Sequence, residues 1–373
     1  MEALAREGSL KASARSPRGP GPGVTTEILE GVEAVDRLAP AWDELADDAE
    51  APACRRPGWV RAWWRAFGRG SLNLVTVRRD GRLVGVVPMQ RRNGELRSTS
   101  NYHTPSFGLL AADPAAVDSL ATALIRSTPR RLTVAFLAEG ESSLAALEAS
   151  SRKARRPTVV RVLERCPYIA LDGTWENLLE TRRHQFAREL RRRRRRLHAR
   201  GRFELDVQDG SRDLERYFEE GLVIEAAGWK GENGTAIASS PETRGFYLEI
   251  ARWLASRGSL RLSFLRLDGR AFAFEFAYEE CGRYSLLKSG YDESWRSDAP
   301  GVLLRAATIE RAFEVGLRRY DFLGKDDPWK REWTSMVEVQ VQLQSFRRTP
   351  DATADWAAQR YLRPLARRLL KRP

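Results

Sequence analysis

The chain has 373 residues, and 63 Lys and Arg against 50 Asp and Glu give it a formal net charge of +13. This length suffices for two domains of ordinary size, and no stretch approaches the roughly 20 apolar residues that cross a bilayer. The three cysteines lie far apart and only three histidines are present, which argues against a disulfide framework and a zinc site. We therefore expect a cytoplasmic protein that holds no metal and meets an anionic partner.

The first 23 residues combine small side chains with alternating glycine and proline at their end. They lack the apolar core of a signal peptide, so a disordered tail is expected over 1–23. A strand and two helices follow, and the second helix carries Trp59, Trp63 and Trp64 at helical spacing. This tryptophan cluster is interpreted as core, with a ligand-stacking site as the alternative.

Two hairpins far apart in the chain share a sequence pattern. The hairpin predicted at 72–90 turns at Asp80-Gly81, and the hairpin predicted at 260–278 turns at Asp268-Gly269. Both dipeptides suit a tight two-residue turn, and leucine, arginine, aspartate and glycine recur at the same spacing before and within each turn. Each hairpin follows a helix and precedes a third strand, which indicates two copies of one fold.

The first copy continues with a loop at 102–106, helices near 115–126 and 143–149, and strands at 132–137 and 158–163. The loop carries a histidine, His103. It is interpreted as an ordinary loop residue, with a catalytic role as the alternative.

The second copy opens with an arginine-rich helix. Thr174 is expected to cap a helix over 175–198, in which positions 191–196 are all arginine. Two interpretations remain open: a solvated face in an arginine-rich protein, or a surface that binds a polyanion such as tRNA, a nucleotide-sugar or an anionic lipid. The residues assigned to that surface are Arg188, Arg191, Arg195, Trp229, Lys230 and Trp329.

The most informative stretch begins at residue 260. The second hairpin is followed by a strand at 283–291, a helix at 302–316 and a short strand at 319–323. Three meandering strands, a crossover helix and a fourth strand place the last two strands in parallel, joined by a βαβ unit. This order predicts an α/β fold with a mixed sheet.

The order of elements resembles the core of the GNAT acyltransferases, in which acyl-CoA enters between the last two strands. In that family the pyrophosphate rests on a loop that reads Gln/Arg-x-x-Gly-x-Gly/Ala, and residues 296–301 read Arg-Ser-Asp-Ala-Pro-Gly. Ala299 replaces the first glycine and Pro300 removes an amide donor, so we expect a weaker anion site. The resemblance implies acetyl-CoA, or another acyl-CoA, as cosubstrate. The residues that it assigns to binding are Arg296, Ser297, Asp298, Ala299, Gly301 and Val302.

A narrower resemblance covers roughly the last half of the chain. The residues that carry it are Tyr291-Asp292, 300–304, Gly316, 321–324 and the motif Trp329-Lys330-x-x-Trp333. In this order they resemble the FemAB-like, CelD (BcsL) group of cellulose-biosynthesis-type acetyltransferases.

That resemblance implies two tandem GNAT-like units, which agrees with the repeated hairpin. We expect an N-terminal unit at 24–165 without a CoA site, because no phosphate-loop pattern follows its third strand, and a catalytic unit at 166–346. Residues 347–373 are predicted to form a basic amphipathic helix that covers the domain, with contact to an anionic membrane as the alternative.

Acyl transfer from a thioester to an amine needs a base, donors for the oxyanion and a pocket that orients both reactants. No nucleophile motif is visible, so direct attack is expected. An uninterrupted hairpin would place Glu275 opposite Lys288, as a general base beside a lysine or as a structural ion pair. Lys330 is interpreted as an oxyanion donor, a role that the resemblance implies, or as a surface lysine between two tryptophans. Tyr291 is interpreted as the acid that protonates the leaving thiolate.

The hypothesis is an N-acetyltransferase that moves an acyl group from acyl-CoA to an amine. The resemblance suggests an envelope sugar or a polysaccharide precursor as the acceptor. Two alternatives stay open: an aminoacyl-tRNA-dependent peptidyl ligase like the Fem proteins, and a non-enzymatic protein that binds polyanions.

Overall fold

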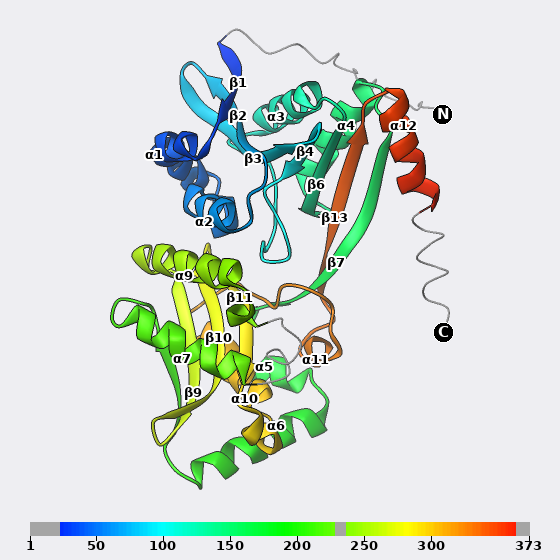
Figure 1. Ribbon diagram of the computed structural model, residues 1–373. Coiled ribbons are helices and arrows are strands. Elements are labelled where there is room, and N and C mark those ends of the chain that lie inside the picture. The colour runs from blue at the N-terminus through cyan, green and yellow to red at the C-terminus, as the bar shows by residue number, and fades with distance from the viewer. Residues whose placement is uncertain (1–22, 228–235, 363–373) are drawn as a thin grey trace, which may run out of the picture.

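One mixed sheet runs through the whole fold and joins two units, which lie one above the other in Figure 1. The structure is a computed structural model that describes residues 23–227 and 236–362. The tail expected over 1–23, apart from Gly23, lies outside these residues, as do Trp229 and Lys230.

The first unit combines a curved sheet with four α-helices and a 3₁₀ turn. Its strands are β1 (Val24–Glu30), β2 (Ser71–Arg79), β3 (Arg82–Arg92), β4 (Glu95–Ser98), β5 (Leu110–Ala111), β6 (Arg131–Ala138) and β7 (Thr158–Ala170). Its helices are α1 (Val32–Asp48), η1 (Ala53–Arg55), α2 (Pro57–Phe67), α3 (Pro114–Ser127) and α4 (Ser142–Lys153).

The second unit repeats this order with shorter strands near its end. Its strands are β8 (Phe203–Gln208), β9 (Leu260–Leu267), β10 (Arg270–Glu280), β11 (Arg283–Tyr291), β12 (Arg319–Asp321) and β13 (Val337–Phe346). Its helices are α5 (Trp175–Glu180), α6 (His184–His198), α7 (Leu214–Ala226), η2 (Ile237–Ser239), α9 (Pro241–Ser256), η3 (Glu293–Asp298), α10 (Pro300–Glu314) and α11 (Pro328–Arg331), and the chain continues into α12 (Pro350–Ala357) and the π-helix η4 (Ala358–Leu362).

The last strand of each unit is exchanged with the other unit. The sheet runs β1-β2-β3-β4-β6-β13-β7-β12-β11-β10-β9-β8, with β5 on β3. Strand β7 therefore lies beside β12, and β13 lies beside β6. The two exchanged strands pair with each other from Val337 opposite Pro167 to Ser345 opposite Thr158. Each unit completes its sheet with a strand of the other, and the boundary expected after residue 165 falls inside β7.

Both units contain the same βαβ arrangement and the same hairpin. Strands β4 and β6 are parallel across α3, as β11 and β12 are across α10. The turns expected at Asp80-Gly81 and Asp268-Gly269 have positive φ at both residues, as a type I′ turn requires. The prediction of two copies of one α/β unit is confirmed.

The register expected for Glu275 is wrong. The turn at Cys281-Gly282 pairs Glu280 with Arg283 as expected, but further along β10 pairs Glu275 with Ser289 and Phe276 with Lys288. The register shifts between Phe276 and Ala277 because β11 contains an extra residue there, a β-bulge at Leu287. Since side chains alternate between the two faces of a sheet, Glu275 and Lys288 lie on opposite faces.

The arginine-rich helix is divided in two. Thr174 caps α5 as predicted, and its hydroxyl accepts a hydrogen bond from the backbone N–H of Asn177. The helix then stops at Glu180, where the Thr181 hydroxyl donates to the carbonyl of Leu178 at 2.7 Å. Such a local bond competes with helix continuation, so α6 starts afresh at His184.

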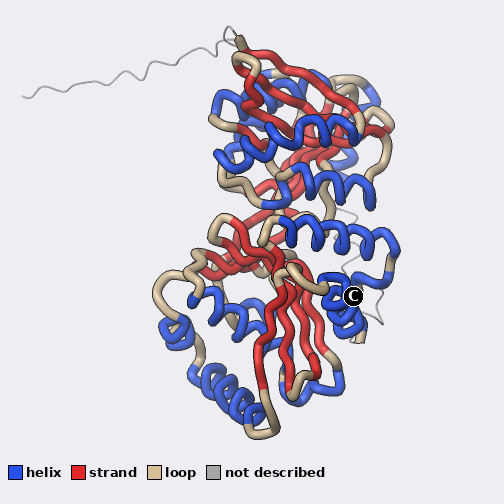
Figure 2. Tube along the Cα trace, turned by 90° about the vertical axis from the view of Figure 1, so that its left-hand side faces the viewer, coloured by secondary structure: helices blue, strands red, loops and turns tan. Residues whose placement is uncertain are grey.

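Helices cover both faces of the second unit's sheet (Figure 2). The core that contains α7 and α9 also takes in Trp59 and Trp63 from α2 of the first unit, and both side chains are buried. Gly58 allows this approach, because a Cβ atom there would lie 2.1 Å from the indole nitrogen of Trp253. The interpretation of the tryptophan cluster as core is confirmed, and the cluster joins the two units.

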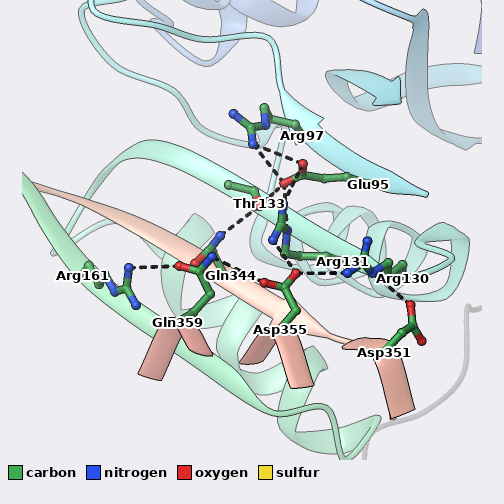
Figure 3. A network of polar contacts seen from close by, with 10 residues as sticks. All are labelled: Glu95, Arg97, Arg130, Arg131, Thr133, Arg161, Gln344, Asp351, Asp355 and Gln359. Atoms are coloured by element: carbon green, nitrogen blue, oxygen red, sulfur yellow. Dashed lines mark hydrogen bonds and ion pairs between the residues drawn. The ribbon is translucent and has the colours of Figure 1, made fainter. Parts of the chain in front are cut away.

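The C-terminal segment covers the first unit. Ala352 of α12 is fully buried against Val159 and Phe346. The carboxylate of Asp355 lies 2.5 Å from Arg131, which also pairs with Glu95 at 2.9 Å (Figure 3). Of the two roles expected for the segment 347–373, the described part fits a helix that covers the domain. Residues 363–373 lie outside the described part.

We predict that Asp355→Ala loosens α12. The replacement removes a half-buried charged hydrogen bond to Arg131, which is worth about 1.5 kcal/mol. Hydrogen exchange of the α12 amides should become faster, while that of β6 stays slow. Asp351→Ala on the same helix is the matched control, because its more exposed carboxylate pairs with Arg130 at 3.0 Å, and its effect should be smaller. Equal exchange rates in both variants would contradict this prediction.

Candidate active site

A wedge opens between β11 and β12. The two strands pair at only three positions, Arg283–Ser285 opposite Arg319–Asp321. Strand β11 continues to Tyr291, whereas the chain leaves the sheet after Asp321. The bulge at Leu287 lies where pairing has ended, and a bulge bends its strand. The half of β11 beyond Ser285, which pairs with β10 but not with β12, therefore forms one wall of an opening that was expected from the sequence.

A cleft of about 800 Å³ occupies this opening. The second unit contributes the half of β11 that does not pair with β12, the start of α10 and the loop that follows β12. The first unit contributes the opposite wall, so the cleft lies between the units. Residues of that opposite wall include Tyr102, His103, Thr104, Pro105, Phe136 and Glu164.

The N-terminus of α10 opens into the cleft. Arg296, Ala299, Gly301 and Val302 line it, as expected for a site that holds phosphates. Ala299 adopts a left-handed conformation with φ 53° and ψ 57°, which explains why the related pattern has glycine at this position. The unpaired amides of a helix N-terminus attract anions.

Ser297 and Asp298 do not reach this cleft wall. The carboxylate of Asp298 is buried and forms ion pairs with Arg196 and, at 2.9 Å, with Arg200. Arg196 also donates to the carbonyl of Ser297 at 3.0 Å. These two residues, assigned to binding from the sequence, connect the loop to α6 and so hold it in position.

Glu275 lies beneath the cleft and not on its surface. Its carboxylate is fully buried and forms an ion pair with Arg305 of α10. The phenols of Tyr284 and Tyr320 donate to the same carboxylate at 3.1 and 3.4 Å. Burial raises the pKa of Glu275, while Arg305 and the hydrogen bonds oppose this rise.

Arg305 connects the buried carboxylate to the cleft. It lines the cleft wall, donates to Ser289 at 3.3 Å and lies 5.1 Å from the ring centre of Trp329. Trp329, assigned to substrate binding, also lines the cleft and is 40% exposed. The Glu275–Arg305 pair therefore fixes a cation at the point where α10 and the loop after β12 meet.

Lys330 is buried and holds the loop after β12. Its ammonium group donates to the carbonyls of Leu323 and Lys325 at 2.7 and 2.6 Å and lies 3.3 Å from Asp327. Leu323 has a φ of 51°, so the loop needs such support. Burial lowers the pKa of Lys330, although Asp327 opposes this effect.

Lys288 and Tyr291 both line the cleft from β11. The ammonium of Lys288 lies 5.6 Å from the ring centre of Tyr247. Burial lowers the pKa of Lys288, and Glu225 opposes this shift. Burial raises the pKa of Tyr291, so its phenol keeps its proton at neutral pH.

Sequence reasoning missed Glu164. This glutamate of β7 is 9% exposed and lines the cleft, and burial raises its pKa. The strand was expected to end at residue 163, and only the exchange of β7 between the units brings the carboxylate to the cleft. No local sequence signal indicates this position.

The first unit has a similar pair of strands but fills the space beside them. The backbone N–H of Ala135 on β6 donates to the hydroxyl of Ser98 at 3.1 Å, and the carbonyl of Phe136 accepts from Phe107 at 2.8 Å. Phe107 is buried in the core of the first unit. The chain after β4 therefore covers the edge of β6 beyond the three positions at which β4 and β6 pair.

The arginines of α6 divide into three groups. Arg192 and Arg193 form ion pairs with Glu189 of the same helix at 2.7 and 2.8 Å. Arg194 and Arg196 form ion pairs with Glu310 and Asp298, so they fix the helix to its neighbours. Arg188, Arg191 and Arg195, which were assigned to polyanion binding, are exposed at positions three and four residues apart. Such spacing places them on one face of the helix.

Comparisons with known proteins identify the class of fold. Residues 184–331 match a family model described as an acetyltransferase (GNAT) domain. FemX gives a TM-score of 0.58 at 11% identity over 84% of this chain and 98% of that chain. The C-terminal domain of a protein described as a lysylphosphatidylglycerol synthetase, from Agrobacterium fabrum, gives 0.55 at 11% identity over 87% and 96%. L-PGS from Bacillus licheniformis gives 0.50 at 11% identity over 80% and 95%. The search of curated proteins found no match.

The fold is therefore of the GNAT type, in two tandem units, and residues 184–331 are similar to a GNAT-type acetyltransferase domain. The predicted GNAT resemblance is confirmed at this level. Among the described residues, no group of His, Cys, Asp and Glu could hold a metal ion. Within the same ranges, no helix combines the length and apolar character that a membrane span requires.

We predict that Arg305→Met destabilises the protein by about 3–5 kcal/mol at pH 7, because it leaves the carboxylate of Glu275 buried without its cation. The pKa of Glu275 then rises further above its unfolded value, so the folded state binds a proton more tightly. The lost stability should return as pH falls through this folded pKa. Urea unfolding at pH 7 and pH 5 measures the difference.

The double variant Arg305→Met with Glu275→Gln is the control. It removes both charges and should regain most of the free energy of unfolding at pH 7. A double variant as unstable as Arg305→Met would show that lost packing, and not the buried charge, causes the defect.

We predict that His103 makes stability fall at mildly acidic pH. Its ring stacks on Phe67 with centres 5.2 Å apart and lies 3.2 Å from the Tyr247 hydroxyl, and burial lowers its pKa to about 4. The unfolded state binds the proton more readily, so stability is lost as pH falls from about 6.5 toward 4. His103→Gln should reduce this slope in urea unfolding. A slope that stays unchanged in His103→Gln would refute the assignment.

Proposed function

We propose that the protein is an N-acyltransferase that moves an acyl group, in the simplest case acetyl, from acyl-CoA to an amine by direct attack. The wedge between β11 and β12 carries this proposal, because it opens next to the N-terminus of α10. An extended thioester arm can add to the edge of β11 where its pairing with β12 has ended. A pyrophosphate can bind at the helix N-terminus. Within the described residues, the chain after β4 fills the corresponding space of the first unit.

Direct attack is favoured over a covalent intermediate by the state of the thiols. Burial raises the pKa values of Cys54 and Cys281, and it raises that of Cys166 to about 12. A neutral, buried thiol is a poor nucleophile. The amine therefore attacks the thioester itself, and the protein contributes orientation, charge and proton transfer.

The cleft residues divide the chemical work. Tyr291 donates a proton to the leaving thiolate. Arg305, fixed by Glu275, provides positive charge for the oxyanion. Lys330 orders the loop that forms one wall, because its protons are directed to two carbonyls and Asp327. We thus assign Glu275 and Lys330 as positioning residues, in contrast to the base and oxyanion donor expected from the sequence.

The acceptor that fits the sequence resemblance to CelD-type proteins is an amine on an envelope sugar or a polysaccharide precursor. An aminoacyl-tRNA-dependent peptidyl ligase is the second candidate. The exposed arginine face of Arg188, Arg191 and Arg195 favours it, because phosphate backbones bind such faces. This candidate would be supported if the protein binds charged tRNA with a steep salt dependence and does not bind CoA.

We predict that CoA binds at Gly301 and that Gly301→Glu weakens its binding about 30-fold or more, close to 2 kcal/mol. Among the described residues, a Cβ atom at Gly301 would contact Tyr291 alone, at 3.5 Å, so the variant should fold. The new carboxylate repels phosphates from the helix N-terminus. Isothermal titration with CoA measures the dissociation constant.

Gly245→Glu is the matched control. Gly245 is an exposed helical glycine, and a Cβ atom there would have nothing within 4 Å, so the replacement adds the same charge away from the cleft. This variant should bind CoA like the wild type. Equal affinity in both variants would show that the N-terminus of α10 does not bind the phosphates of CoA. If the wild type does not bind CoA, the acyl-CoA proposal is wrong.

A further inference from the structure

Strand β7 passes beyond the end of β12 into the wedge. The two strands pair from Tyr168 opposite Asp321 to Ala170 opposite Arg319, and Phe322 donates its N–H to the carbonyl of Pro167. After Phe322 the second unit's chain turns away, while β7 extends further back from Pro167 to reach Glu164. Glu164 thus lies where the wedge is open, on a strand that begins in the first unit.

The carboxylate of Glu164 lies within electrostatic reach of several charged groups. On β13, Gln340 lies opposite Glu164 and donates a hydrogen bond to the carbonyl of Pro105 at 2.6 Å. Lys325 and Lys330 attract its charge, Asp327 repels it, and Cys166 lies within electrostatic reach on the same strand. The ammonium of Lys330 is directed to other acceptors. Among the described residues, no ion pair within 4.0 Å involves Glu164.

The wall next to Glu164 comes from the first unit and is partly aromatic. Tyr102 is 79% exposed and packs edge-to-face on Phe136, with ring centres 5.8 Å apart. Phe136 has a φ of 62°, a conformation that costs free energy and is found where a structure needs a particular side-chain position. This side of the cleft faces the thioester side and offers a carboxylate next to apolar surface.

We propose that a primary amine enters from the first-unit side and that Glu164 is the general base that takes the proton from its ammonium form. This inference rests on the proposed function and names its acceptor side. The first unit, which lacks its own wedge, then serves the reaction by supplying the base and the acceptor wall.

The proton and bond changes balance with acyl-CoA as the second substrate. Glu164 accepts one proton from the ammonium group and releases it to solvent. The amine lone pair forms the C–N bond at the thioester carbon, and collapse of the tetrahedral intermediate breaks the C–S bond. Tyr291 donates its proton to the departing sulfur and regains one from the nitrogen, so the products are an amide, free CoA and one proton.

The test compares two small amines that differ in basicity. Ethylamine is protonated at pH 7 and needs a base, whereas 2,2,2-trifluoroethylamine is largely unprotonated and does not. With acetyl-CoA and the full chain, Glu164→Gln should lower kcat for ethylamine about 100-fold, the size of a general-base effect. It should lower kcat for trifluoroethylamine by only a few-fold and leave the CoA dissociation constant unchanged.

Glu338→Gln is the control for folding and charge, because Glu338 lies on β13 opposite Cys166 and pairs with Arg319 at 3.2 Å. It should keep both rates. Equal losses for the two amines, or none, in Glu164→Gln would overturn the assignment of the base. A wild type that binds CoA but acetylates neither amine would overturn entry of a simple amine. Failure of the wild type to bind CoA would instead reject the proposed function.

Discussion

The cleft depends on the exchange of β7 and β13 between the two units. Because β7 occupies the outer edge of β12, the short strand β12 needs to pair with β11 over only three residues to stay in the sheet. Backbone hydrogen bonds that a longer parallel pair would form are left open on β11, and the wedge is the result. The same exchange brings side chains of the first unit to the cleft.

Charge inside the second unit is arranged around this opening. The buried carboxylate of Glu275 and the guanidinium of Arg305 neutralise each other's charge. The guanidinium can therefore stay charged at the cleft wall although little water reaches it. The carboxylate of Asp298 likewise forms ion pairs with Arg196 and Arg200. Part of the excess of arginine in α6 is therefore structural, and Arg188, Arg191 and Arg195 remain as the exposed face.

Local patterns predicted the elements well, because turn and strand signals act over a few residues. The Asp-Gly turns, the Thr174 cap and the helix before the last short strand follow from residue chemistry alone. The bulge at Leu287 could not be foreseen, since an extra residue leaves no mark in an alternating sequence. It moved Lys288 to the face opposite Glu275.

The pairing of strands that are far apart in the sequence could not be predicted either. Nothing near Glu164 indicates that β7 continues to Ala170 or that it pairs with both β12 and β13. Of the residues assigned to the site, those around the helix N-terminus were reached through the family resemblance, and most of them line the cleft. The first-unit wall and Glu164 required the three-dimensional pairing.

The shared sheet also has a consequence for how the chain can be divided. A fragment that ends before β13 leaves β6 with an open edge, and a fragment that begins after β7 leaves β12 with one. Exposed edges of this kind invite pairing between molecules. Separate halves would therefore be prone to associate, either with each other into the native arrangement or with copies of themselves into aggregates.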